Sequence, residues 1–168
     1  MTRAQLPAVG FLYVALALPA LIVGPDHLRL QASLLSAATF AYIWFVASLR
    51  ARLVRFDPDG FFASAVVLGG ATYLPFQMIA VLGGDTLSAG PSAACAAVVI
   101  VGSSLAASRA RKIPKWFGKA GVAGGLAVLA VGLVEVAADW TFVGQSVFAS
   151  SLGFLFWVVV TATYLLRR

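Results

Sequence analysis

Two carboxylates stand near the end of a long apolar stretch of the sequence. Glu135 and Asp139 are four residues apart in the segment LVEVAADW, residues 133–140. On an α-helix this spacing places both side chains on the same face. Carboxyl groups held in an apolar site can act as general acids toward an apolar substrate. The pattern therefore predicts a catalytic site in which Glu135 is the acid and Asp139 or Asp85 assists.

The elements that must position these acids are membrane-spanning helices. Hydrophobic residues make up 61% of the 168 residues and charged residues 11%, whereas soluble proteins average about 45–50% and about 25%. About 20 apolar residues are needed for a helix to cross the hydrocarbon core. The sequence predicts an all-α bundle, folded as one domain, with six spans at 8–24, 30–49, 61–83, 88–107, 119–139 and 145–166. The sequence DPDG, residues 57–60, also predicts a turn that caps the start of the span 61–83.

The basic residues predict how the six spans are threaded. Of the twelve Lys and Arg residues, all except Arg29 fall in segments on one side of the membrane. The positive-inside rule then places both termini in the cytoplasm and leaves three hairpins facing outward, in the inner or plasma membrane of the cell. Residues 1–24 could pass for a signal peptide, but we expect them to be retained because they complete the six-helix count. The net charge of +6 is thereby explained by topology and membrane lipid, so we expect no nucleic-acid partner.

The expected depth of the polar residues indicates a site near the outer face. Counted from Lys119, Glu135 lies about 24 Å along its helix and Asp139 about 30 Å. Counted from Phe61, Gln77 also lies about 24 Å along its helix, level with Glu135. Polar residues gather in this outer half, which predicts a cavity open to the outer face or just below it. Its expected substrate-binding residues are Tyr73, Phe76, Gln77, Phe148, Trp140 and Gln31.

The spans 88–107 and 119–139 consist largely of small residues and contain no aromatic side chain. Gly121 and Gly125 form a small-xxx-small pair, which lets helix backbones approach closely in lipid. We expect these spans to pack inside the bundle or against partner membrane helices. Polar side chains in bundles often only bond helices together, so a structural partner of Glu135, such as Gln77, Tyr73 or Arg29, stays open as an alternative.

A resemblance to known proteins is carried by residues 112–133, KIPKWFGKAGVAGGLAVLAVGL, and by the final Leu165–Arg168, LLRR. This part resembles a bacterial family of small polytopic membrane proteins without an assigned function, over the last two thirds of the chain. The resemblance implies the helical fold and its topology. A looser, architectural similarity is to small integral-membrane terpene cyclases, which combine an aromatic-lined cavity with acids that protonate an alkene or epoxide.

Three functions are compatible with these patterns. The first is an enzyme that needs no metal and no cofactor and acts on a lipid-like or isoprenoid substrate, with aromatic faces that stabilise cationic intermediates. The single His27 and single Cys95 leave no metal-spaced cluster for other chemistry. The second is an accessory or scaffold subunit of a membrane complex. The third is a small carrier of protons or cations, which the nearly apolar inner half disfavours.

Overall fold

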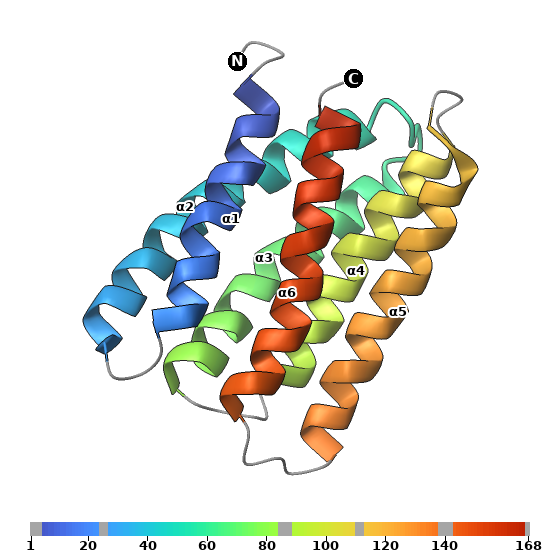
Figure 1. Ribbon diagram of the computed structural model, residues 1–168. Helices are drawn as coiled ribbons and strands as arrows, with labels where there is room; N and C mark the ends of the chain where they lie inside the picture. Colours follow the sequence, from blue (N-terminus) through green and yellow to red (C-terminus); the bar gives the residue numbers. More distant parts are fainter. Residues whose placement is uncertain (1–4, 24–26, 84–88, 110–112, 138–142, 167–168) are drawn as a thin grey trace.

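Six α-helices run back and forth along one axis in the computed structural model (Figure 1). The structure describes residues 5–23, 27–83, 89–109, 113–137 and 143–166, without the side chains at 5–6, 81, 83, 89, 143–149 and 165–166. No strand occurs in these ranges, so the predicted all-α class is confirmed. The helices are α1 (Gln5–Val23), α2 (Leu28–Leu53), α3 (Phe61–Gly83), α4 (Ala89–Ser108), α5 (Lys115–Ala137) and α6 (Val143–Thr161), followed by a π-helical segment, η3 (Ala162–Leu166).

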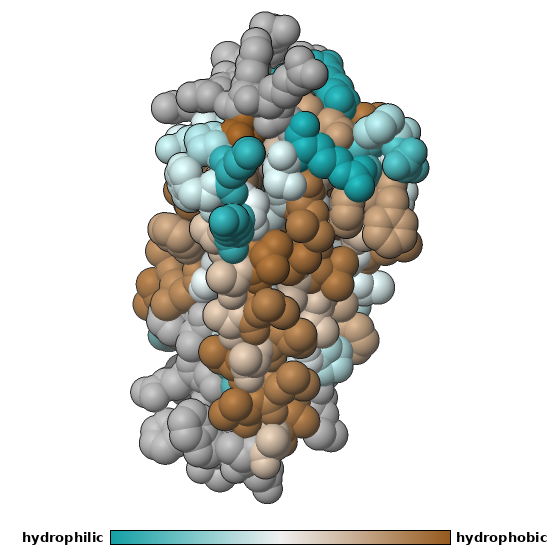
Figure 2. All heavy atoms as spheres, turned by 90° about the vertical axis from the view of Figure 1, so that its right-hand side faces the viewer, coloured by the Kyte–Doolittle hydropathy of each residue, from teal (hydrophilic) through white to brown (hydrophobic). Residues whose placement is uncertain are grey.

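The helices have the length and surface of a membrane protein. Four of them, α2 to α5, are long and apolar enough to cross a membrane. The apolar segments of α1 and α6 are shorter, at Pro7–Val23 and Ser150–Tyr164. Figure 2 shows a hydrophobic surface along the middle of one face, with hydrophilic side chains gathered at the end where α1 begins.

Two helices, α4 and α6, each pack against several others. α4 packs against both α3 and α5, α1 packs against α2, and α6 touches α1, α3, α4 and α5. The start of α1 and the end of η3 lie at the same end of the bundle (Figure 1). This arrangement leaves α5 packed mainly on α4 and less on α6.

Aromatic rings fill the centre between α1, α2, α3 and α6. The ring of Tyr42 lies 4.9 Å from that of Tyr13 and 5.7 Å from that of Tyr73, centroid to centroid. Phe154 of α6 completes the group, 4.6 Å from the ring of Tyr73. All four side chains are buried. These aromatics pack on one another at distances typical of stabilising ring pairs.

The turn between α2 and α3 is organised by the buried side chain of Asp57. Its Oδ2 accepts hydrogen bonds from the backbone N–H groups of Phe62 at 2.7 Å and Ala63 at 3.1 Å, so the predicted cap at the start of α3 is confirmed. Its Oδ1 pairs with Nη1 of Arg109, beyond the end of α4, at 2.8 Å. Gly60 completes the turn with a φ of 67°, a conformation that favours glycine. The turn thereby joins α3 to the end of α4.

Candidate functional site

Glycines along α5 let this helix approach α4 closely. Gly118, Gly125 and Gly132 lie on its buried face. A Cβ atom on Gly125 would lie only 2.6 Å from Cγ2 of Val101 on α4, closer than van der Waals contact allows. The close approach therefore depends on the missing side chains, as the small-xxx-small pattern predicts.

A second row on the buried face of α5 turns toward α6. A Cβ atom on Gly121 would lie 2.6 Å from Cβ of Ser104 on α4 and 2.6 Å from Cη2 of Trp157 on α6, so this row lies between the two helices. Seven residues further along α5, Cγ2 of Val128 would lie 3.1 Å from a Cβ atom on Gly153 of α6. Gly121, Val128 and Glu135 follow one another at intervals of seven residues, which is about two helical turns. By this spacing Glu135 is the next member of the row, near the end of α5.

The carboxyl group of Glu135 is buried and has no partner among the residues that the structure describes. The residue is 3% exposed, and neither carboxyl oxygen has a hydrogen-bond partner among the described residues. Burying a polar group without a hydrogen bond costs about 1–3 kcal/mol in protein mutational data. The packing of the described residues gives no structural reason for this side chain.

The first turn of α4 fixes the level of Glu135 in the bundle. A Cβ atom on Gly90 would lie 2.7 Å from Cγ2 of Val136 and 3.7 Å from the carbonyl oxygen of Gly132. Glu135 lies between these two residues of α5, so it is level with the beginning of α4. It belongs to the half of the bundle opposite to the Asp57 turn.

Gln77, which was expected at the same depth, is held by hydrogen bonds between helices. Its Nε2 donates to Oγ of Ser151 on α6 at 2.9 Å, and its Oε1 accepts from Oγ of Ser92 on α4 at 2.8 Å. Ser92 comes two residues after Gly90, so Gln77 does lie near the level of Glu135. The network joins α3, α4 and α6, and Glu135 is not part of it.

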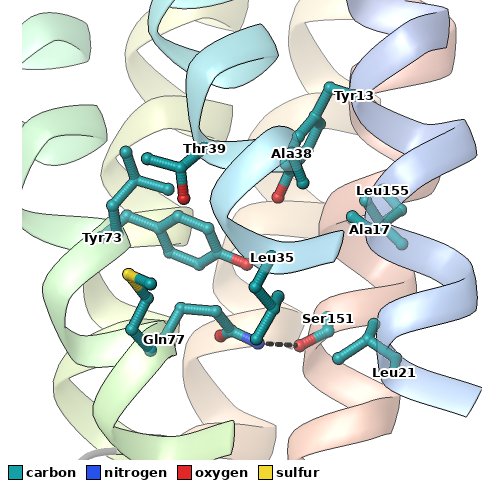
Figure 3. Close-up of a pocket in the computed structure, with 12 residues that line it drawn as sticks. Tyr13, Ala17, Leu21, Leu35, Ala38, Thr39, Tyr73, Gln77, Ser151 and Leu155 are labelled. Atoms are coloured by element: carbon teal, nitrogen blue, oxygen red, sulfur yellow. Dashed lines mark hydrogen bonds between the residues drawn. The ribbon is translucent and has the colours of Figure 1, made fainter. Parts of the chain in front are cut away.

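A cavity of about 20 Å³ lies beside this network, between α1, α2, α3 and α6 (Figure 3). Three hydroxyl-bearing side chains, those of Tyr13, Tyr73 and Ser151, line the cavity together with Gln77. A water molecule needs about 10–15 Å³ and two to four polar partners. The cavity therefore suits one water molecule and is too small for an isoprenoid, and Glu135 does not line it.

The predicted site residues thus have different positions. Tyr73 and Gln77 line the same small cavity. Gln31 is buried, and its Nε2 donates to the carbonyl oxygen of Ala20 at 3.1 Å, which joins α2 to α1. Phe76 is half-buried and does not line the cavity. Lying outside the described residues are Asp85, Asp139, Trp140 and the side chain of Phe148.

Two polar residues of this region, one lining the cavity and one in the network, were missed in the sequence. Tyr13 stands alone among apolar residues of α1, and Ser92 follows Pro91 in the first turn of α4, where a capping role is the simpler interpretation. The helical period could have found Tyr13, because it shares its buried face with Ala17 and Ala20 at spacings of four and seven residues.

No protein-family model, curated protein or solved structure matches the chain. The resemblance to a bacterial family and the looser similarity to terpene cyclases therefore stay predictions. Among the described residues, no group of three or more His, Cys, Asp or Glu side chains could hold a metal ion. The chemistry that the site offers is that of one carboxyl group in apolar surroundings.

Proposed function

We propose that this chain is an integral membrane enzyme in which the carboxyl group of Glu135 donates a proton to an isoprenoid-like substrate. The observation that supports the proposal is that this carboxyl is buried and has no partner among the described residues. Ionisable residues inside membrane helices are costly and typically serve a function. An apolar site also excludes water, which would otherwise capture a reactive cation.

The packing of α5 supports a route by which such a substrate reaches the acid. Glu135 continues the row of α5 that faces α6, and α5 packs less on α6 than on α4. A flexible hydrocarbon chain dissolved in the bilayer would enter between α5 and α6 at the level of the first turn of α4. The substrate needs no aqueous entrance along this route.

The proposed reaction is an isomerisation that balances without a co-reactant. The Glu135 carboxyl transfers its proton to one carbon of an alkene, whose π electrons form the new C–H bond and leave a carbocation. The π electrons of a second double bond in the same molecule attack the cationic carbon, and the new C–C bond closes a ring. The cyclic cation then loses a proton to the Glu135 carboxylate, which restores both the acid and a C=C bond.

We also propose that all six helices span the cell membrane, with both termini in the cytoplasm. The alternation of the helices supports this threading, since the start of α1 and the end of η3 lie at one end of the bundle (Figure 1). Arg50 and Arg55 lie near the end of α2, and Arg109 follows α4 at the same end. The positive-inside rule assigns this end to the cytoplasm.

The enzymatic proposal is tested by solvent deuterium. Parent protein and Glu135→Gln are placed in phosphatidylcholine nanodiscs in D₂O with squalene, and products are separated by gas chromatography and weighed by mass spectrometry. A carboxyl proton exchanges with solvent, so each cyclised product should carry one deuterium. We expect Glu135→Gln to lower conversion by at least about 100-fold, the usual contribution of a general acid.

Asp59→Asn is the matched control, because it removes an exposed carboxylate from the turn before α3 and should leave conversion unchanged. Equal conversion by the parent and Glu135→Gln would contradict the proposal. So would the absence of any conversion of squalene by the parent. Either result would favour the accessory-subunit alternative.

A further inference from the structure

A groove on the outside of the bundle runs between α2 and α3, away from Glu135. Its volume is about 230 Å³, below the roughly 300–1,000 Å³ of pockets that enclose a drug-sized ligand. It can therefore take one chain segment of a larger molecule. Its walls are formed chiefly by Tyr42, Val46 and Arg50 of α2 and Val67, Gly70 and Leu74 of α3.

The groove is shallow at Gly70, where α2 and α3 approach closely, and its rim is formed by small residues. A Cβ atom on Gly70 would lie 3.0 Å from Cγ2 of Val46 and 3.3 Å from the hydroxyl oxygen of Tyr42. Ala47 and Ala71 line the groove as well, and both are exposed. The groove is thus open toward the surroundings of the helices, which for these two spans is lipid.

The two ends of the groove differ in chemistry. Tyr42 is buried and lines the groove at one end. Arg50, eight residues further along α2 or about 12 Å, is exposed at the other end, and it forms no ion pair among the described residues. An apolar channel that ends at a free guanidinium matches an amphiphile with an anionic head, because Arg binds phosphate oxygens in bidentate fashion.

We propose that this groove binds an anionic phospholipid of the surrounding leaflet, with its phosphate on Arg50 and part of one acyl chain between α2 and α3. The basic residues around Arg50 lie at the membrane surface, where anionic headgroups collect. The site is separate from Glu135 and does not depend on the proposed reaction. It gives the bundle a preferred lipid at the end opposite to the acid.

Native mass spectrometry of retained lipid tests the proposal. The protein is purified in a mild detergent from nanodiscs that contain equal parts of phosphatidylglycerol and phosphatidylcholine. We expect the parent to retain one phosphatidylglycerol in preference to phosphatidylcholine. Arg50→Gln should lower this preference about fivefold, the contribution of one basic residue near an anionic surface. Ala47→Leu should fill the groove and reduce retention of both lipids.

Two controls keep the result specific. Arg55→Gln removes an exposed charge outside the groove, and Ala37→Leu enlarges an exposed residue elsewhere on α2; both should retain lipid as the parent does. The proposal is overturned if the parent shows no preference, if Arg50→Gln keeps it, or if Arg55→Gln loses it equally. Thermal unfolding in a zwitterionic detergent confirms that each variant is folded.

Discussion

At the scale of single residues, Glu135 stands out because it is a buried carboxyl group whose two oxygens have no hydrogen-bond partner among the described residues. Other buried polar side chains of the outer network are bonded, as Gln77 is to Ser92 and Ser151. Natural proteins keep destabilising groups mainly where activity needs them. If Glu135 is such a group, its removal should improve stability while it abolishes chemistry.

We therefore predict that Glu135→Met raises the free energy of unfolding. The two side chains are similar in length, and the variant removes the unbonded carboxyl, so the gain should be about 1–3 kcal/mol. The measurement is reversible unfolding in mixed micelles of mild detergent and sodium dodecyl sulfate, followed by far-ultraviolet circular dichroism. Leu133→Met, at an exposed position on the same helix, is the control and should change stability by less than about 0.5 kcal/mol.

A loss of stability in Glu135→Met would have a clear meaning. It would show that the carboxyl is bonded in the folded protein, for example by a residue outside the described ranges. The interpretation in which Glu135 bonds to a structural partner would then replace the interpretation in which it is a catalytic acid. The two measurements on Glu135, activity and stability, thus separate a functional group from a structural one.

At the scale of elements, the α4–α5 pair shows that glycine position matters more than glycine content. Gly121 and Gly124 are both on α5, three residues apart. Gly121 is packed against Ser104 and Trp157, whereas a Cβ on Gly124 would meet nothing within 4 Å. Only the first of the two is therefore required for close packing.

We predict opposite effects for alanine at these two positions. Gly121→Ala forces its methyl group into Ser104 and should lower the free energy of unfolding by about 1–3 kcal/mol, as overpacked cores do. Gly124→Ala should be neutral or should stabilise α5 by up to about 1 kcal/mol through helix propensity. The same micelle unfolding assay compares them. Equal effects at both positions would mean that α4 and α5 are not packed closely through this face.

The helices themselves were largely predictable from the sequence. The expected span 61–83 coincides with α3, and 88–107 is shifted by one residue from α4. α5 begins at Lys115 rather than at residue 119, because Pro114 can start a helix and interfacial residues such as Trp116 continue it outside the apolar core. Apolar length therefore predicted where each helix lies, and it underestimated the length of α2 and α5.

For the candidate site, the sequence predicted only the level along the bundle at which Gln77 and Glu135 lie. A fixed rise per residue placed Gln77 and Glu135 at one level, and their shared proximity to the first turns of α4 agrees with this. The rotation of each helix about its axis depends on packing between segments far apart in sequence, such as Gln77 with Ser151. The sequence therefore could not indicate that Gln77 bonds to α6 while Glu135 stays apart from it.

At the scale of the whole molecule, the two ends of the bundle have different tasks in the proposed arrangement. The end with the Asp57 turn carries most basic residues and the lipid groove, and the other end carries Glu135. This assignment requires that the chain cross the membrane at every helix. Since the apolar segments of α1 and α6 are shorter than those of the other four helices, their crossing is the step that most needs a direct measurement.

We predict the threading from the accessibility of single cysteines. The background is Cys95→Ala, which removes the one native thiol. A membrane-impermeant maleimide should label His27→Cys in intact cells, because residue 27 is exposed and the proposed threading turns its hairpin outward. Asp59→Cys, exposed in the turn before α3, should react only after the membrane is opened. Thr2→Cys and Arg168→Cys should behave like Asp59→Cys if α1 and α6 both span. Labelling of either terminal position in intact cells would show that α1 or α6 does not cross the membrane. The membrane faces on which Glu135 and the groove lie would then have to be assigned again.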